Sequence, residues 1–211
     1  MAELPEPAPR QQLHTRQVTT RGYLRDDGLW DLECELVDTK TYSYRNGGGQ
    51  ERKAGDPVHH MKIRLTVDGA MTVRDVAASM PATPFAECQP AADPMRGMVG
   101  VKIGPGWRKA IDEAMGDVRG CTHLRELLGA MATVAFQTIP NYQLHLRRVN
   151  GEPLFIGGKP GFQMGKCMSW DFNGPAVARV APQFIGWNLR PDAAEPSAKK
   201  PSTEKSSAGK P

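Results

Sequence analysis

A cysteine and a histidine two residues apart, at the expected start of a helix, carry the strongest chemical signal in this sequence. Cys121 follows Gly120 and directly precedes an apolar helical stripe, so unpaired backbone N–H groups and the positive end of the helix dipole would favour its thiolate. His123 could act as its base or share a metal ion with it. An inert pair, with Cys121 packed in the core and His123 bonded to a carbonyl, fits the same residues equally well.

Two further cysteines leave a metal-binding interpretation open. Cys88 lies in an irregular stretch that contains prolines, and Cys167 stands at the start of an expected strand. Together with Cys121 and His123 they could complete a Cys3His tetrahedron, the ligand set typical of structural zinc. Zinc is therefore the cofactor that these residue types suggest.

Two adjacent histidines precede another expected strand. Neighbouring strand residues point to opposite faces of a sheet, so only one of His59 and His60 is expected to face a pocket. His59 could be a general base or a further metal ligand. A histidine that merely bonds solvent or backbone where the strand begins is the competing interpretation.

Charged residues near these strands could hold a substrate. If the strands share a sheet, Arg25 and Arg64 could bind a carboxylate or phosphate in bidentate fashion, with Asp38 and Lys40 as further substrate-binding candidates. The competing interpretation places these charges on a solvated sheet face, paired with the acidic residues of the neighbouring strand.

Alternation of apolar and polar residues predicts strands in the first half of the chain. Trp30 to Leu36 and Met61 to Val67 alternate with period two, and the turn pairs Asp27-Gly28 and Asp68-Gly69 predict hairpins. Cys34 shares the apolar face of the first of these strands and is expected in the core. The stretch from Met71 to Met80 fits a helix or a strand, and we favour the returning strand.

Helical spacing appears in the middle of the chain. Trp107 to Met115 and Leu124 to Val134 each keep one apolar face, with Thr122 as the expected N-cap of the second helix. Tyr142 to Leu146 and Met168 to Phe172 alternate again and are expected to be strands. The sequence therefore predicts an α+β fold, an antiparallel sheet of hairpins with two or three helices packed on one face.

The expected organisation is a single α+β domain over residues 14–190 between two disordered segments, residues 1–13 and 191–211. The second segment contains no Val, Ile, Leu, Phe, Met or aromatic residue, so burial cannot offset the entropy cost of ordering it. In the first segment, Pro5, Pro7 and Pro9 exclude a helix.

Composition narrows the class of protein and of partner. The formal net charge of the 211 residues is +4, too small an excess to indicate a nucleic-acid binder. No apolar run approaches the roughly 20 residues of a membrane helix. No secretory signal is recognisable, so the four cysteines are expected to stay reduced in the cytoplasm. The expected partner is a small-molecule ligand, rather than a nucleic acid or a membrane.

Five short phrases, in this order, resemble a bacterial family, the domain of unknown function 2889. They are Arg25-Asp26-Asp27-Gly28-Leu29-Trp30; Asp38-Thr39-Lys40; Pro57-Val58-His59-His60-Met61 running into Arg64-Leu65-Thr66-Val67-Asp68; Pro84 with Cys88; and Gly120-Cys121-Thr122-His123-Leu124. The resemblance covers about residues 14 to 185, and it implies no particular reaction.

A fainter likeness concerns the order of a hairpin, a cysteine-bearing loop and Gly120-Cys121 at a helix start. This order is similar to the scaffold that assembles iron–sulfur clusters. The likeness implies a metal held by cysteines, an aspartate and a histidine or cysteine.

We therefore expect an enzyme that acts on a small anionic or aromatic metabolite, for example in its catabolism. Cys121 and His123 would form the reacting centre, His59 would assist proton transfer, and Arg25 or Arg64 would hold the substrate. A zinc-binding or iron–sulfur scaffold-like module without turnover is the first alternative. The second is a protein-interaction adaptor that uses the basic tail and a Gly-rich loop.

Overall fold

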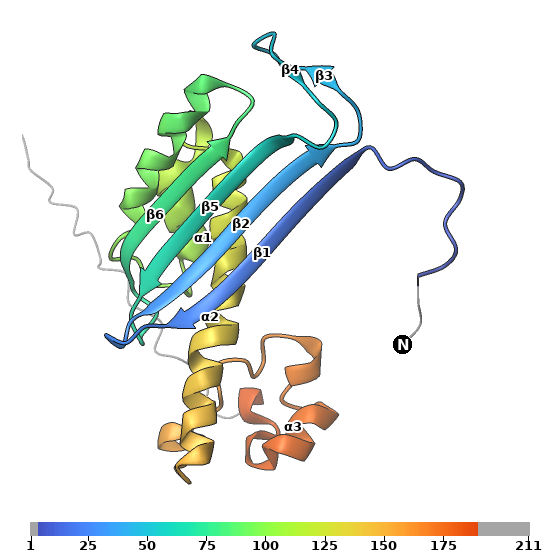
Figure 1. Ribbon diagram of the computed structural model, residues 1–211. Coiled ribbons are helices and arrows are strands. Elements are labelled where there is room, and N and C mark those ends of the chain that lie inside the picture. Colours follow the sequence, from blue (N-terminus) through green and yellow to red (C-terminus); the bar gives the residue numbers. More distant parts are fainter. Residues whose placement is uncertain (1–3, 190–211) are drawn as a thin grey trace, which may run out of the picture. The chain divides into compact units, whose positions relative to one another are not determined.

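The first half of the chain forms an antiparallel sheet in the computed structural model, which describes residues 4–189 (Figure 1). Its four strands lie in the order β1-β2-β5-β6. They are β1 (His14–Leu24), β2 (Trp30–Lys40), β5 (Pro57–Val67) and β6 (Val73–Ala82). A small hairpin of β3 (Tyr44–Arg45) and β4 (Glu51–Arg52) connects β2 to β5.

The alternating residues form strands because one side of each strand can be buried. Along β2, Trp30, Leu32, Cys34 and Leu36 are all buried and point to the same side, as expected. Cys34 is therefore a core residue, and burial raises the pKa of its thiol to about 11. The returning strand expected between Met71 and Met80 is also confirmed, as β6.

The buried side of the sheet is covered by helices. The 3-10 helix η1 (Ala86–Met98), α1 (Trp107–Met115) and α2 (Thr122–Val149) pack against it, and Figure 1 shows α2 running behind the strands. A short 3-10 helix η2 (Asp117–Arg119) links α1 to α2. The predicted α+β fold, an antiparallel sheet with helices on one face, is confirmed.

The structure corrects three local predictions. Tyr142 to Leu146 is not a strand but part of α2, whose 28 residues include Pro140, directly after the buried Ile139. Met168 to Phe172 is not a strand either, since the 3-10 helix η4 (Met168–Trp170) and a turn occupy it. Alternation over five residues is too short to distinguish a strand from a helix. The N-cap of α2 is Cys121, one residue before the expected Thr122.

The residues after Asn150 form a second compact unit, which we describe by itself. Besides η4 it contains η3 (Ile156–Gly158), α3 (Pro175–Val180), η5 (Pro182–Phe184) and η6 (Trp187–Leu189). Its own small core consists of Met164, Val177, Ala181 and Phe184.

The structure describes the predicted domain and the two predicted terminal segments to different extents. A single domain over residues 14–190 stays a prediction, because two compact units can belong to one domain. The tail predicted over residues 191–211, and the first three residues of the segment 1–13, lie outside the described residues. None of the helices in residues 4–189 is long and apolar enough to cross a membrane.

Candidate functional site

A buried carboxylate lies on the helix-covered side of the sheet, where β2 ends. Asp38 follows Leu36 in the period-two pattern, so its side chain points inward, and it is only 2% exposed. Strand register brings Arg16 of β1 directly opposite Asp38 on one side and His59 of β5 opposite it on the other. Three strands thus deliver an acid, a guanidinium and an imidazole to one place.

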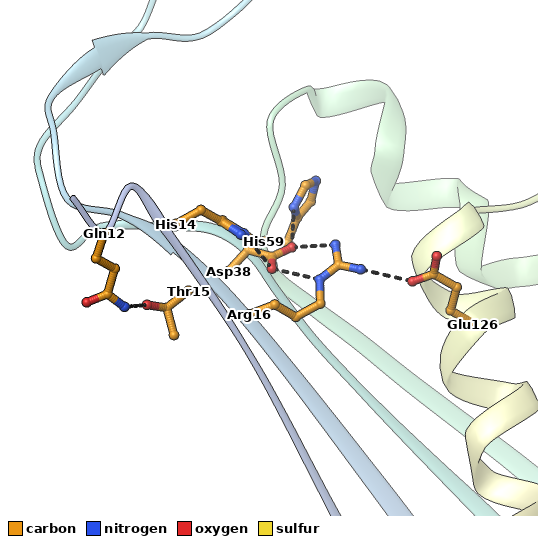
Figure 2. Close-up of polar contacts among 7 residues, drawn as sticks. All are labelled: Gln12, His14, Thr15, Arg16, Asp38, His59 and Glu126. Atoms are coloured by element: carbon orange, nitrogen blue, oxygen red, sulfur yellow. Dashed lines mark hydrogen bonds and ion pairs between the residues drawn. The ribbon is translucent and has the colours of Figure 1, made fainter. Parts of the chain in front are cut away.

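Hydrogen bonds saturate both oxygens of Asp38 (Figure 2). Arg16 donates from Nε to Oδ1 and from Nη2 to Oδ2, each over 2.9 Å, which is the bidentate geometry of strong arginine–carboxylate pairs. His59 Nδ1 lies 2.9 Å from Oδ2, and His14 Nε2 lies 3.1 Å from Oδ1. Four hydrogen bonds therefore hold one side chain.

These contacts keep Asp38 ionised. Burial alone would raise its pKa, but the hydrogen bonds and charge of Arg16, with the hydrogen bonds of His59 and His14, lower the pKa of Asp38 to about 2. An ionised carboxylate only accepts hydrogen bonds, so His59 Nδ1 must carry the proton that it shares with Asp38. In the neutral ring, Nε2 of His59 is then left as an acceptor.

The first turn of α2 adds a second imidazole and a thiol. The ring of His123 lies on that of His59, with centroids 4.1 Å apart and planes tilted by 40°. Cys121, at the N-cap, makes no capping hydrogen bond with its side chain, and its Sγ lies 3.7 Å from His123 Nδ1. Burial, followed by the charges of His59 and Arg16, lowers the pKa of His123, so this ring is neutral at pH 7.

An ion pair ties the strands to this helix. Arg16 Nη1 contacts Glu126 Oε2 of α2 at 2.9 Å, so one guanidinium joins β1, β2 and α2 (Figure 2). We call His14, Arg16, Asp38, His59, Cys121 and His123 the Asp38 cluster. It combines an oriented histidine, a neutral histidine and a thiol, which are the groups of acid–base and nucleophilic catalysis.

The same place could hold a metal ion. Ligand atoms of Asp38, His59 and His123 all lie within 4.8 Å of one another, and within residues 4–189 this is the one such group of three or more His, Cys, Asp or Glu residues. Two imidazoles and a carboxylate suit zinc and other transition metals. The bidentate contact of Arg16 competes for the oxygens of Asp38, however, which makes this carboxylate a poorer ligand.

Four of the residues singled out in the sequence meet in this cluster: Cys121, His123, His59 and Asp38. His60, as expected of a neighbour on a strand, points to the other face of the sheet, where its Nε2 lies 2.7 Å from Glu35. The role predicted for Asp38, binding a substrate, stays a prediction, since its oxygens are held by the protein itself.

The other substrate-binding candidates lie apart. Arg25 pairs with Asp27 in the exposed turn after β1, with Nη2 2.7 Å from the carboxylate. Arg64 lies on the uncovered face of the sheet, 3.8 Å from Glu33. Lys40 stands 4.1 Å from the ring centre of Tyr44. The position of Arg64 fits the interpretation that it lies on a solvated sheet face. Arg25, Arg64 and Lys40 do not lie together.

Of the predicted zinc ligands, Cys121 and His123 lie together, whereas Cys88 and Cys167 belong to other elements. Cys88 is half-buried in η1, and Cys167 is exposed in the second unit. No group of potential metal ligands in the described part of the chain includes a cysteine. The Cys88, Cys121, His123 and Cys167 set therefore stays a prediction without support from the geometry.

Sequence reasoning missed His14, Arg16 and Glu126. The predicted turn at Asp27-Gly28 comes close to revealing the first two, but a two-residue turn there would place Arg16 opposite Thr39. The observed turn is centred on Asp27, and it places Arg16 opposite Asp38. Glu126 lies 110 residues from Arg16 in the chain, and nothing local predicts that contact.

Comparison with known proteins gives one match. A family model described as Protein of unknown function (DUF2889) matches residues 14–137, more than half of the chain. No curated protein and no solved structure matches. The fainter likeness to the iron–sulfur scaffold is not shown by these comparisons. The matched region runs from β1 into α2 and contains the whole Asp38 cluster.

Proposed function

The chain belongs to this family of unknown function, whose matched region contains the Asp38 cluster, and on that premise we propose that it is an enzyme acting on a small anionic or aromatic metabolite. One observation carries the proposal: Cys121 Sγ is 3.7 Å from His123 Nδ1, and His123 stacks on a histidine that a buried carboxylate orients. A small molecule, rather than a nucleic acid, is the proposed partner.

Cys121 supplies the nucleophile. Its thiol proton passes to Nδ1 of His123 as Sγ forms a bond to an electrophilic carbon of the metabolite. The bond from that carbon to its leaving group breaks, and His123 passes the proton on to the leaving group. The lowered pKa of His123 supports this role, because the neutral ring has a lone pair ready to accept the proton. A separation of 3.7 Å is long for this transfer, and such contacts commonly shorten when a substrate binds.

His59 moves the second proton. Asp38 fixes this ring through Nδ1, so Nε2 faces away from the carboxylate and can accept a proton from the water that releases the product from Cys121. Because Asp38 stays ionised, it also stabilises the imidazolium that forms on His59. Asp38 thus acts through His59 and does not itself touch the metabolite.

All four cysteines are free, which suits a reducing compartment such as the cytoplasm. We therefore place the proposed enzyme there. A thiol that must stay reduced to act as a nucleophile is consistent with this location.

Alkylation of the full-length protein by iodoacetamide tests the thiol. Mass spectrometry of peptides gives the rate at each cysteine between pH 6 and 9 in one sample. We expect Cys121 to react faster than Cys167 at neutral pH, although Cys167 is the more exposed. His123→Gln should slow Cys121 toward the rate of Cys167, which serves as the internal control. A Cys121 that reacts no faster than Cys167, or that ignores His123→Gln, would refute the proposed nucleophile.

A metal centre is the second candidate function, and the proximity of Asp38, His59 and His123 favours it. Metal analysis after dialysis against zinc should then find about one zinc per chain, lost in His59→Gln and His123→Gln alike. Loss in Cys88→Ser and Cys167→Ser would instead support the four-ligand set. Protein that retains no zinc after dialysis excludes zinc from both sets.

A further inference from the structure

A groove of about 410 Å³ lies between α1 and α2, outside the Asp38 cluster. Arg108 and Ile111 line it from α1, and Thr122, Arg125 and Gly129 line it from α2. The groove therefore offers guanidinium groups beside a small apolar surface. Such a lining fits an organic anion better than a wholly apolar molecule.

The groove is lined by two arginines and two acids, but the pairing of these charges leaves one arginine over. Asp112 forms an ion pair with Arg125, whose Nη2 lies 2.5 Å from Oδ1. Glu126 forms an ion pair with Arg16. Arg108 has no ion-pair partner among residues 4–189. Both acids at the groove are thus already paired, and one cation is left over.

A second donor at the groove is also unsatisfied. Nε of Arg125 is buried and has no hydrogen-bond partner, although its Nη2 is used. A buried donor without an acceptor is costly, and it gains most from a ligand oxygen that reaches it. Arg108 thus has no ion-pair partner, Nε of Arg125 has no acceptor, and both residues line the same groove.

The groove and the Asp38 cluster meet at the first turn of α2. Thr122 lines the groove and stands between Cys121 and His123 in the chain. Glu126, one turn further on the same helix face, lines the groove and binds Arg16, which in turn holds Asp38. A molecule held in the groove would thus lie next to the turn that carries the thiol.

We propose that this groove binds the anionic end of a small organic carboxylate, with Arg108 and Arg125 as its ligands. This inference rests on the proposed function, since it names the substrate class of the same enzyme. Arginine recognises a carboxylate through paired N–H groups, and Ile111 offers an apolar surface to the rest of the molecule. Phosphate is also an anion that arginine binds, but it has no apolar part to place against Ile111.

Titration of the full-length protein with benzoate, followed by NMR, tests this. We expect the Nε–H signals of Arg108 and Arg125 and the amide of Gly129 to shift. Arg108→Gln should weaken benzoate by about tenfold or more, as expected for the loss of a charge-assisted hydrogen bond. Lys109→Gln is the matched control on the same helix, because Lys109 pairs with Glu113 outside the groove, and it should leave the affinity unchanged.

A second variant tests the groove without relying on Arg108→Gln, which could also disturb the fold. An added Cβ at Gly129 would meet nothing within 4 Å, so Gly129→Leu fills the groove without disturbing the helix. It should abolish the benzoate shifts while the rest of the spectrum stays native. Benzoate that binds Arg108→Gln or Gly129→Leu as well as the native protein overturns the inference. Phosphate binding more tightly than benzoate overturns the assignment to a carboxylate.

The groove and the proposed function can fail separately. Cys121→Ser and His59→Gln should still bind benzoate, because neither residue lines the groove. A slowly alkylating Cys121 with intact benzoate binding refutes the nucleophile and keeps the groove. A reactive Cys121 with no benzoate binding refutes only the groove.

Discussion

At the scale of single residues, three side chains from two strands bind one buried carboxylate. Arg16, His14 and His59 all bind Asp38, which is almost fully buried. A buried ion pair of this kind is often no more stabilising than well-packed apolar residues of similar volume, because desolvation offsets much of the attraction. Removal of the carboxylate alone is costly, because the partners are left without their acceptor. This asymmetry gives the first prediction.

Asp38→Asn should destabilise the fold by about 2–4 kcal/mol, because Arg16 and two histidines lose an ionised acceptor in a buried place. Urea unfolding measures the change. Glu33→Gln on the same strand is the matched control, since Glu33 faces the uncovered side and lies 3.8 Å from Arg64. It should cost less than about 0.5 kcal/mol. Equal effects of the two variants would contradict the importance of the buried network.

Acid should remove the contribution of Asp38 in a defined range. The folded pKa of about 2 lies below the ordinary value of 3.8, so the unfolded chain binds more protons between these values. The contribution is therefore complete above about pH 4 and is lost as the pH falls toward 2. The stability difference between the native protein and Asp38→Asn should shrink over this range. A difference that stays constant from pH 5 to 2 would disprove the assignment.

His123 should produce a separate effect at higher pH. Its pKa lies below the ordinary 6.5, so the unfolded chain takes up a proton before the folded protein does. Stability should therefore decrease as the pH falls below about 6.5, and His123→Gln should lack this decrease. Unfolding of both proteins between pH 8 and 5 tests the prediction, and parallel profiles would exclude a lowered pKa.

At the scale of elements, the cluster depends on how closely β1 approaches α2. Gly22 of β1 has no side chain where it meets α2, and an added Cβ would overlap the side chain of Thr138. Gly22→Ala should therefore push the two elements apart and destabilise the fold by about 1–3 kcal/mol. Thermal unfolding measures this change.

The matched glycine for this prediction is Gly129 in the interior of α2. Its Cβ would meet no atom within 4 Å, so Gly129→Ala should stabilise the helix by about 1 kcal/mol. Opposite signs for the two glycine-to-alanine changes are the expected result. A Gly22→Ala protein as stable as the native chain would show that β1 and α2 do not touch as closely as described.

The elements were predictable where their pattern is long. Eleven-residue strands such as β2 repeat the alternation often enough to exclude a helix, and α1 keeps its apolar face through Ile111 and Met115. The second half of α2 was not predictable, because Pro140 looks like a stop and Leu144 and Leu146 alternate. Packing of the preceding turns decides the outcome there, and packing is not a local property.

The candidate site was predictable only in part, for a related reason. Cys121, His123 and His59 carry chemistry by residue type, so they stand out in the sequence. Arg16 does not, because its role comes from strand register and from a helix far along the chain. The sequence identified Asp38 as a charged candidate, but it did not indicate that its carboxylate is buried.

At the scale of the whole molecule, the Asp38 cluster belongs to the first compact unit alone. Residues up to Asn150 contain both the sheet and α2, and the larger core cluster lies entirely among them. A protein that ends at residue 150 should therefore fold, keep the helix and strand content of this unit by circular dichroism, and alkylate Cys121 at the native rate. Loss of folding in this shortened protein would show that the second unit is needed for stability.

The tight turn between β1 and β2 has a consequence for how related chains can differ in length. Its backbone is closed by Arg25 and Leu29, so one extra residue would shift the pairing of the two strands by a step. Arg16 would then point to solvent, and Asp38 would lose its partners on β1 but keep His59 of β5. The long connection between Thr41 and Asp56 sets no such pairing. Insertions and deletions among relatives should therefore collect in that connection and be absent from the turn.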